Sequence, residues 1–212
     1  MTPSVGSSPV ATPPQRRSSV KGIAALCFLL GGGMGFFAGV MSVKGGRDFI
    51  AGLVKTEQKA SVGSPITVER PAFRFQHAGN WKIDVADKDY DADHNFSVET
   101  PGQSFVMIQI ADGILEPRAV VETHTELQTA KIVKQATRTP FTRWGAYTGE
   151  GVLLRGKLLG LMQGSVRIFS FRSGESTYTV VESTYDEDRA SVSPGFELIE
   201  RSFHVKQPPP ER

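Results

Sequence analysis

The hydrophobic positions of this 212-residue chain form one continuous run and, after it, a series of short periodic segments. The run covers residues 22–43, reads GIAALCFLLGGGMGFFAGVMSV and contains no charged side chain, and Lys21 and Lys44 close it on its two sides. As a helix with about 1.5 Å rise per residue it would be about 33 Å long, enough to cross a hydrocarbon core of roughly 30 Å. The pattern therefore predicts one transmembrane helix.

The segments around this run are polar and poor in large apolar side chains. Residues 1–21 are rich in Pro, Ser and Thr, so we predict a disordered tail. Residues 44–65 are small, polar and of mixed charge, which indicates a juxtamembrane linker, and residues 206–212 indicate a second disordered tail. The remaining residues, 66–205, are predicted to form one folded domain.

A cleaved signal peptide is the alternative explanation of the apolar run, because Arg16 and Arg17 precede it and Ala38 and Ser42 are small residues near its end. The run is longer than the core of roughly 7–15 residues found in such signals, which favours retention in the membrane. Basic residues flank the run on both sides. The N-terminal ones lack acidic neighbours, so we expect the N-terminus in the cytoplasm and the domain on the extracytoplasmic side of the cell membrane.

Alternating apolar residues predict strands in the first half of the domain. Residues 73–75 and 81–85 indicate two short strands on either side of the turn residues Gly79 and Asn80. Residues 96–99 and 104–111 indicate a hairpin joined by Pro101 and Gly102. Within its second strand Val106 begins an alternation that predicts one buried face.

A helix is predicted next, opened by Pro117 and continuing to about Ala136. Its apolar side is formed by Val120, Leu127, Ala130 and Val133. After Pro140 three or four antiparallel strands are predicted, with breaks at residues 149–151, 160, 163–164 and 173–174.

The domain is predicted to close with a second helix. Ser193 and Pro194 have the N-cap and first-turn pairing that starts a helix. Phe196, Ile199 and Phe203 then recur at helical spacing and should face the core. Strands and helices in this order predict an α+β domain with an antiparallel sheet.

This order of segments resembles the PsbP-like family. The resemblance covers residues 66–205 and lies mainly in residues 73–85, in the hairpin of residues 167–184 and in the closing Ser202-Phe203. It implies an antiparallel sheet flanked by helices, an α/β/α sandwich, in a family whose members are mostly accessory or binding proteins without known catalysis. The photosystem role of that family is not implied, because no ligand residues of that role can be matched here.

The charge of the chain separates by segment and narrows the possible partners. Residues 65–205 carry 15 basic and 19 acidic side chains, whereas residues 1–43 carry three basic side chains and no acidic one. The basic parts thus flank the predicted membrane segment, which indicates attraction to lipid headgroups and argues against nucleic acid as a partner. The only cysteine, Cys27, lies in the apolar run, so the domain has no disulfide and no thiolate metal ligand.

The sharpest candidate for chemistry is the acidic stretch of residues 84–93, in which Asp89, Asp91 and Asp93 alternate as the oxygen ligands of a calcium loop do. The spacing departs from that loop, because His94 stands where it has Gly and Thr100 where it has a bidentate Glu. A solvated loop is the simpler interpretation, and these three residues are the weak metal candidates.

No other pattern predicts a catalytic or cofactor-binding residue. Residues 151–157 match a phosphate loop through Lys157, but Leu158 replaces the hydroxyl residue that holds magnesium. The four histidines, His77, His94, His124 and His204, lack metal-ligand spacing, and no Gly-x-Ser-x-Gly elbow exists. His124 is expected at the border of the core face of its helix.

Gly31, Gly35 and Gly39 recur every four residues within the predicted membrane helix, a stripe along which two helices could approach and form a homodimer. The alternative is that Gly is simply common in membrane spans. Together the patterns predict a membrane-anchored, non-enzymatic accessory or binding domain with an unidentified protein partner. A membrane-tethered hydrolase-like or calcium-binding domain is the alternative function.

Overall fold

The computed structural model describes residues 58–131, 133–159 and 161–206. The predicted tail, the apolar run with its glycine stripe, most of the linker and the C-terminal tail lie outside these residues. Among the described residues no helix combines the length and the apolar character needed to cross a membrane.

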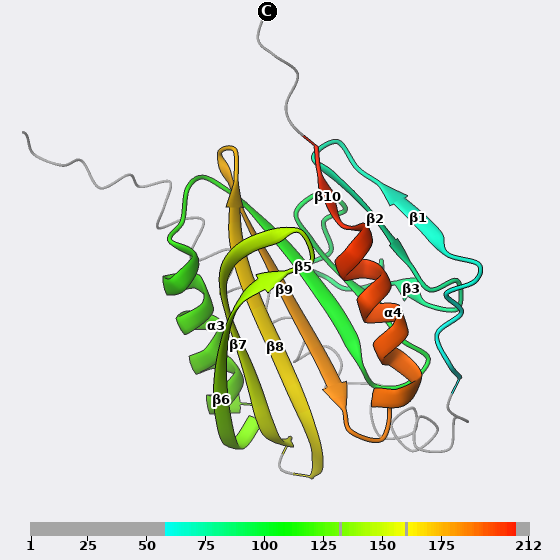
Figure 1. The fold of residues 1–212 in the computed structure, drawn as a ribbon, viewed down its shortest axis with the longest axis vertical. Coiled ribbons are helices and arrows are strands. Elements are labelled where there is room, and N and C mark those ends of the chain that lie inside the picture. Colours follow the sequence, from blue (N-terminus) through cyan, green and yellow to red (C-terminus); the bar gives the residue numbers. More distant parts are fainter. Residues whose placement is uncertain (1–57, 132, 160, 207–212) are drawn as a thin grey trace, which may run out of the picture.

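The described chain contains two α-helices and ten β-strands (Figure 1). In chain order they are β1 Ile66–Glu69, β2 Phe73–His77, β3 Lys82–Ile83, β4 Asn95–Glu99, β5 Phe105–Asp112, α3 Pro117–Lys131, β6 Val133–Trp144, β7 Tyr147–Leu158, β8 Met162–Ser173, β9 Ser176–Tyr185, α4 Arg189–Ser202 and β10 His204–Val205.

Two antiparallel sheets are formed. The larger has seven strands in the order β3-β4-β5-β9-β8-β7-β6, and the smaller has the order β1-β2-β10. The predicted hairpin at Pro101 and Gly102 is confirmed as β4 and β5. The two short strands predicted around Gly79 are confirmed as β2 and β3, which belong to different sheets. The predicted α+β class with an antiparallel sheet is confirmed.

Each helix covers a different face of the large sheet, as the alternation along β5 shows. Val106 and Ile108 belong to the same core cluster as Val192 of α4. Phe105 and Met107, one residue out of phase, belong to a second cluster with Val121 of α3. Successive side chains of a strand point to opposite faces, so α4 and α3 lie on opposite sides of the sheet. The small sheet shares the α4 side (Figure 1).

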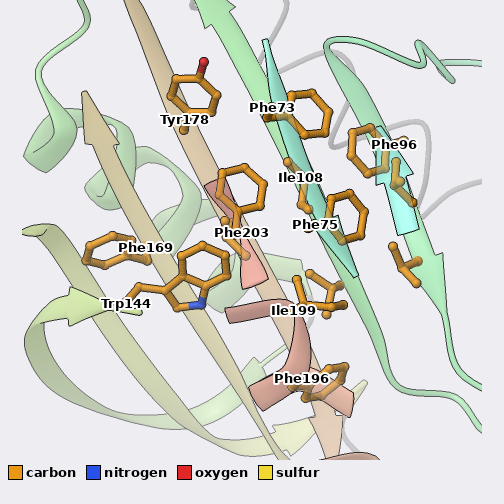
Figure 2. Close-up of a cluster of buried hydrophobic side chains, with 14 of the residues drawn as sticks. Phe73, Phe75, Phe96, Ile108, Trp144, Phe169, Tyr178, Phe196, Ile199 and Phe203 are labelled. Carbon is orange, nitrogen blue, oxygen red and sulfur yellow. The ribbon is translucent and has the colours of Figure 1, made fainter. Parts of the chain in front are cut away.

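Phe203 lies near the centre of the aromatic core on the α4 side (Figure 2). Its ring is 5.7 Å from that of Phe73 in the small sheet and 5.4 Å from that of Trp144 in β6. Phe196 and Ile199 of α4 belong to the same cluster. The core face predicted for the closing helix is therefore confirmed, and one C-terminal ring joins the small sheet to the large one.

The end and the buried face of α3 differ from the prediction. The helix stops at Lys131, and Val133 already belongs to β6. His124, Thr125 and Gln128 are buried, whereas Leu127 is half-buried and Ala130 exposed. The predicted start at Pro117 and the burial of Val120 are confirmed. The predicted end was wrong because β6 pairs with β7 from Val133 onward, and this pairing overrides the helical spacing.

The break predicted at residue 160 is confirmed, because β7 ends at Leu158 and β8 begins at Met162. Gly149, Gly151 and Gly164, in contrast, lie inside these strands and do not break them. A Cβ added at Gly149 would come within 2.2 Å of the Ser170 carbonyl oxygen, and one added at Gly151 within 2.6 Å of the Phe141 ring. These glycines permit close approach of neighbouring groups and do not mark turns. The break predicted at Ser173 and Gly174 is confirmed, with Gly174 at φ +59.

The start of α4 also differs from the prediction. The helix begins at Arg189, and Pro194 lies inside it. The Ser193 hydroxyl donates to the Arg189 carbonyl at 2.7 Å, so it does not cap the helix. Ser-Pro was misread as an N-terminus because both residues also fit inside the first turns, where Pro removes only one backbone donor.

The chain is already held against the domain before β1. The Ala60 amide donates to the Ser191 carbonyl at 2.9 Å, and the Gly79 amide donates to the Ser61 carbonyl at 3.0 Å. The Ser61 amide donates to Asn80 Oδ1 at 2.9 Å. Residues 60 and 61, within the predicted linker, are thereby fixed to the start of α4 and to the turn after β2.

Candidate functional site

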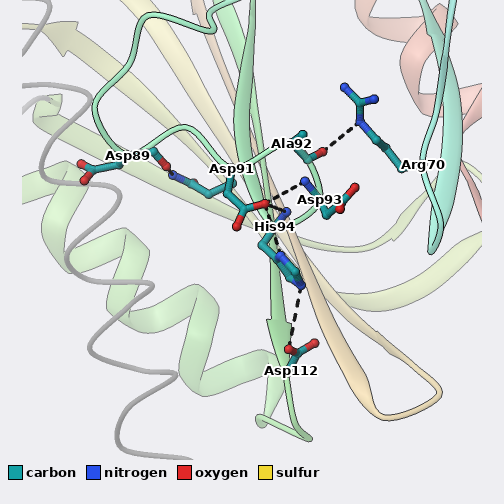
Figure 3. A network of polar contacts seen from close by, with 8 residues as sticks. Arg70, Asp89, Asp91, Ala92, Asp93, His94 and Asp112 are labelled. Carbon is teal, nitrogen blue, oxygen red and sulfur yellow. Dashed lines mark hydrogen bonds and ion pairs between the residues drawn. The ribbon is translucent and has the colours of Figure 1, made fainter.

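The acidic loop before β4 is organised by its own side chains (Figure 3). Asp91 Oδ1 accepts the backbone amides of Asp93 at 2.9 Å and His94 at 3.1 Å. The hydrogen bond from the Asp93 amide is the main reason that the pKa of Asp91 is lowered, and His94 contributes further. Arg70 fixes the loop from the small sheet by donating to the Ala92 carbonyl at 3.0 Å.

These contacts affect whether the carboxylate oxygens of Asp89, Asp91 and Asp93 are available to a metal ion. One oxygen of Asp91 is already occupied by backbone amides, and Asp89 Oδ2 lies 3.8 Å from the Lys88 ammonium. Within the described ranges no group of three or more His, Cys, Asp or Glu side chains could hold a metal ion. Metal binding by these three aspartates stays a prediction, and the contacts described above add no support to it.

The four histidines lie on four separate parts of the fold. His77 is in β2, His94 in the acidic loop, His124 in α3 and His204 in β10. Burial lowers the pKa of His77. It also lowers the pKa of His124 to about 4, so this side chain is neutral at pH 7. His124, expected at the border of the core face of its helix, is buried within that face.

The segment that matches a phosphate loop is the strand β7, paired on both sides from Gly151 to Leu158. Its backbone amides belong to an extended strand that does not lead into a helix. A phosphate cradle needs amides that converge at the start of a helix, so the match is accidental.

A partly buried charge network, which the sequence analysis did not predict, joins the large sheet to α4. Arg167 Nη1 donates to Glu200 Oε2 at 2.6 Å and to Glu182 Oε2 at 3.4 Å. Glu182 also accepts the Trp144 indole N–H at 2.9 Å, and Glu200 accepts the Gly145 amide at 2.8 Å. The network therefore holds the β6–β7 turn, the middle of the sheet and the last turns of α4 together.

The electrostatics of this network follow from burial. Burial raises the pKa of Glu182, and the charge of Arg167 and the Trp144 hydrogen bond oppose the rise only in part. Burial by itself lowers the pKa of Arg167, but Glu200 and Glu182 outweigh it, so that the pKa is raised. Each carboxylate is engaged by Arg167 and by one further donor, which indicates a structural role.

The hairpin of β6 and β7 is the most basic part of the fold, and we call its five basic side chains the basic ribbon. The residues are Lys134, Arg138, Arg143, Arg155 and Lys157, against one acidic residue, Glu150. All five are exposed, and within the described residues none forms an ion pair, unlike Lys82, Arg118, Arg167, Arg189 and Lys206. Counting charge strand by strand would have found this feature in the sequence.

The strand β6 has a second notable property, because it is the last strand of the large sheet. One of its edges thus has no strand partner among the described residues. Eight of its 12 residues are exposed, including every position from Thr137 to Pro140. At about 3.3 Å per residue this edge is about 40 Å long.

Apolar side chains gather at the turn between β7 and β8, and we call Leu159 and Leu161 of the turn together with Met162, the first residue of β8, the Leu161 tip. Leu158 pairs with Met162 across the turn, and the Leu161 amide donates to the Leu158 carbonyl at 3.0 Å. Leu161 is 71% exposed, the highest value among the exposed large hydrophobic side chains of the described chain. The run Leu-Leu-Gly-Leu-Met is visible in the sequence, but its position in a turn is not.

No protein-family profile matches the chain, and no curated protein matches it. Solved structures do align with it. The Ran-binding protein Mog1p of Saccharomyces cerevisiae aligns with a TM-score of 0.46 and 10% identity over 67% of this chain and 95% of its own. LpqN of Mycobacterium tuberculosis, involved in cell envelope biogenesis, gives 0.45 and 8% over 68% and 90%.

A cyanobacterial PsbP from a Synechocystis species aligns with a TM-score of 0.40 and 11% identity over 73% of this chain and 99% of its own. It bears the name of the family that the sequence resembles. At these identities and scores the neighbours establish neither a shared family nor a shared function. The proposals below therefore rest on the residues of this chain.

Proposed function

We propose that this protein is a single-pass membrane protein whose extracytoplasmic domain binds a protein partner and catalyses no reaction. The observation that carries the binding role is the edge of β6, which is long, exposed on both faces from Thr137 to Pro140 and unpaired on one side among the described residues. An exposed edge of this kind can accept an extended segment of another protein through backbone hydrogen bonds.

The chemistry of this edge favours an acidic partner segment. Arg138 and Arg143 are exposed on β6 and form no ion pair within the described chain. Pro140, between them, cannot donate a backbone hydrogen bond, so a pairing segment would engage the residues on either side of it. Basic residues and Pro also protect an edge from pairing with further copies of the same chain, which keeps the edge selective.

Membrane anchoring is supported by the uncharged apolar run of residues 22–43 and by the basic residues on both of its flanks. In this proposal residues 1–21 stay in the cytoplasm and the domain lies outside. Self-association through Gly31, Gly35 and Gly39 belongs to the same proposal and would place two domains side by side.

Partner capture from detergent-solubilised membranes tests the binding role. The full chain with a C-terminal tag should recover a partner, and the paired substitutions Arg138→Glu and Arg143→Glu should reduce its recovery, because they reverse the charge of the proposed edge. Arg172→Glu is the matched control, since Arg172 is an equally exposed arginine on β8. Equal recovery with both sets of variants would contradict binding at β6.

Anchoring is tested separately on the same material. Extraction of membranes with alkaline carbonate should leave the full chain in the pellet, and a C-terminal reporter that is active only in the cytoplasm should be silent. Release into the supernatant would overturn the anchor, and an active reporter would overturn the orientation. Neither result would alter the outcome of the partner capture.

A further inference from the structure

The Leu161 tip has a composition that the folding of a turn does not require. Connections between antiparallel strands usually contain Gly, Asn, Asp or Ser, which suit the backbone and face water. Here the connection reads Leu159-Gly160-Leu161, so a glycine is flanked by two leucines, and Leu161 is 71% exposed. A single exposed leucine is common on protein surfaces, so the tip needs a second observation before it indicates a contact.

The two leucines of this turn have different surroundings. Leu159 has φ +53, in the left-handed region that residues with bulky side chains rarely adopt. Its side chain is half-buried and packs against the core cluster on the α3 side, so the domain itself accounts for a leucine at this position. Leu161 is the side chain that the turn leaves in water.

Basic side chains lie directly beside the tip. Lys134 and Lys157 are cross-strand partners, and Arg155 lies two residues before Lys157 on the same face of β7. Like charges directly opposite each other on a sheet repel. Lys134 Nζ donates to the Ala130 carbonyl at 2.5 Å, but none of the three forms an ion pair within the described residues. The arrangement favours an anionic surface.

The tip also lies at the end of the molecule where the chain enters the domain. Ala60 is hydrogen-bonded to Ser191 in the first turns of α4. Just before α4, the Asp186 amide donates to the Gln163 carbonyl at 3.0 Å, and Gln163 pairs with Lys157. Figure 1 shows the first described residues, the start of α4 and the β7–β8 turn toward the same end.

Carboxylates also occur at this end, but most are engaged. Asp186 forms an ion pair with Arg189, and Asp188 Oδ2 accepts hydrogen bonds from the Gln103 amide at 3.2 Å and the Ser104 hydroxyl at 3.0 Å. Glu187 is exposed. The acidic loop lies beyond the other end of the sheet, where His94 approaches Asp112 at the end of β5. The 12 residues of β8 separate the two ends by roughly 36–40 Å.

We infer that the Leu161 tip and the basic side chains of Lys134, Arg155 and Lys157 form a second membrane contact. Leu161 enters the interfacial region of the bilayer, and the three basic side chains bind anionic lipid headgroups. The inference rests on the proposed anchor. Residues 44–57 span at most about 50 Å when extended, so the anchor keeps the domain within reach of the bilayer.

The test places a fluorescent reporter at each end of the full chain. In a Cys27→Ser background, which removes the only native cysteine, Leu161→Cys or Ile114→Cys is labelled with a polarity-sensitive dye and the protein is reconstituted into vesicles. Ile114 is a matched control, because it is 64% exposed and lies after β5 at the acidic end. Vesicles contain either neutral lipid alone or neutral lipid mixed with an anionic phospholipid.

The label at position 161 should emit at shorter wavelength in anionic vesicles and be quenched by a bilayer-embedded quencher, while the label at position 114 should stay water-exposed. Adding Lys157→Gln should lower the ratio of bound to free tip about fivefold, the effect of one basic residue at an anionic surface. Equal signals at both positions would overturn the inference. A signal at position 161 that depends on protein density and not on lipid charge would also overturn it, by indicating contact between copies.

Failure of the anchor is distinguishable from failure of the tip contact. Vesicles that lose the protein on alkaline extraction would show that residues 22–43 do not insert. Vesicles that retain the protein, with the label at position 161 still in water, would remove the tip contact and leave the anchor intact.

Discussion

At the scale of single residues, the central feature is the buried carboxylate of Glu182, whose burial cost is only partly offset by its partners. This carboxylate is 6% exposed and has one charged partner, Arg167, and one neutral donor, Trp144. Removing one partner of a buried pair leaves a charge that neither water nor protein stabilises. Arg167 therefore favours the ionised form of Glu182 and also holds α4 in position through Glu200.

Arg167→Met should lower the free energy of unfolding by about 3–5 kcal/mol near neutral pH, because it leaves Glu182 buried without its partner. Urea denaturation measures this loss. Arg172→Met, at an exposed position of the same strand, is the control and should change stability by less than about 0.5 kcal/mol.

The loss in Arg167→Met should also depend on pH. Burial raises the pKa of Glu182, so the folded variant binds a proton more readily than the unfolded chain, whose Glu has a pKa of about 4.3. Stability of the variant thus falls as pH rises from that value through the folded pKa. The deficit should be larger at about pH 8 than at about pH 5. A deficit independent of pH would assign the loss to packing alone.

At the scale of elements, α4 depends on close contact with the segment after β2. A Cβ built on Gly195 would lie 2.3 Å from two ring atoms of Trp81. Glycine inside a helix costs about 1 kcal/mol relative to alanine, so its presence at this position is explained by the contact with the indole. The same ring stacks edge-on against Phe196 at 5.2 Å.

Gly195→Ala should therefore destabilise the domain by about 1–3 kcal/mol, although alanine favours the helix, because the indole must shift in a close-packed core. Thermal unfolding followed by circular dichroism measures it. Glu197→Ala, at an exposed position of the same helix, should have little effect. Trp81→Leu should lower the free energy of unfolding less in the Gly195→Ala background than in the native chain. If the effects of the two substitutions simply add, the steric explanation is wrong.

The elements could be predicted to different degrees, for physical reasons. Strands with alternating apolar residues, such as β5, and the helix face of Phe196, Ile199 and Phe203 were predicted because burial imposes their period. The boundary between α3 and β6 was not, because pairing with β7 decides it and the partner strand is distant in sequence. The glycines of β7 were read as breaks because a glycine that admits a neighbouring ring looks the same in a sequence as one in a turn.

The candidate sites were less predictable than the fold. Arg167, Glu182 and Glu200 are widely spaced along the chain and come together only through register and the position of α4, so no motif marks them. The basic ribbon and the apolar run at the Leu161 tip are contiguous or nearly so, and local counting would have found them. The aspartates of residues 84–93 attracted attention by spacing, yet several of their oxygens serve the turns of their own loop.

At the scale of the whole molecule, the domain includes residues before β1. Four hydrogen bonds at residues 59–61 connect this segment to the start of α4 and the turn after β2. Ala60 packs against the aromatic core. The folded domain therefore begins before β1, within the segment that the sequence analysis assigned to the linker.

A fragment that begins at Ile66 should therefore melt at a lower temperature than one that begins at Gln58. Loss of four hydrogen bonds of about 1 kcal/mol each, several of them partly exposed, corresponds to a decrease of about 5–10 °C for a domain of this size. Differential scanning calorimetry on the two fragments measures the difference. Identical melting temperatures would show that residues 58–65 link the domain to the preceding chain without stabilising it.

The pairing of β10 with β2 has a consequence for how the protein is made. Phe73 stacks on Phe203, and the Lys206 amide donates to the Ala72 carbonyl at 2.8 Å. One of the earliest strands of the domain, β2, therefore completes its contacts only when the last residues of the domain are present. During synthesis β2 thus emerges with an unpaired edge and with Phe73 and Phe75 exposed to water. The domain can complete its fold only after Lys206 has left the ribosome, and until then it is a substrate for chaperones of the compartment in which it folds.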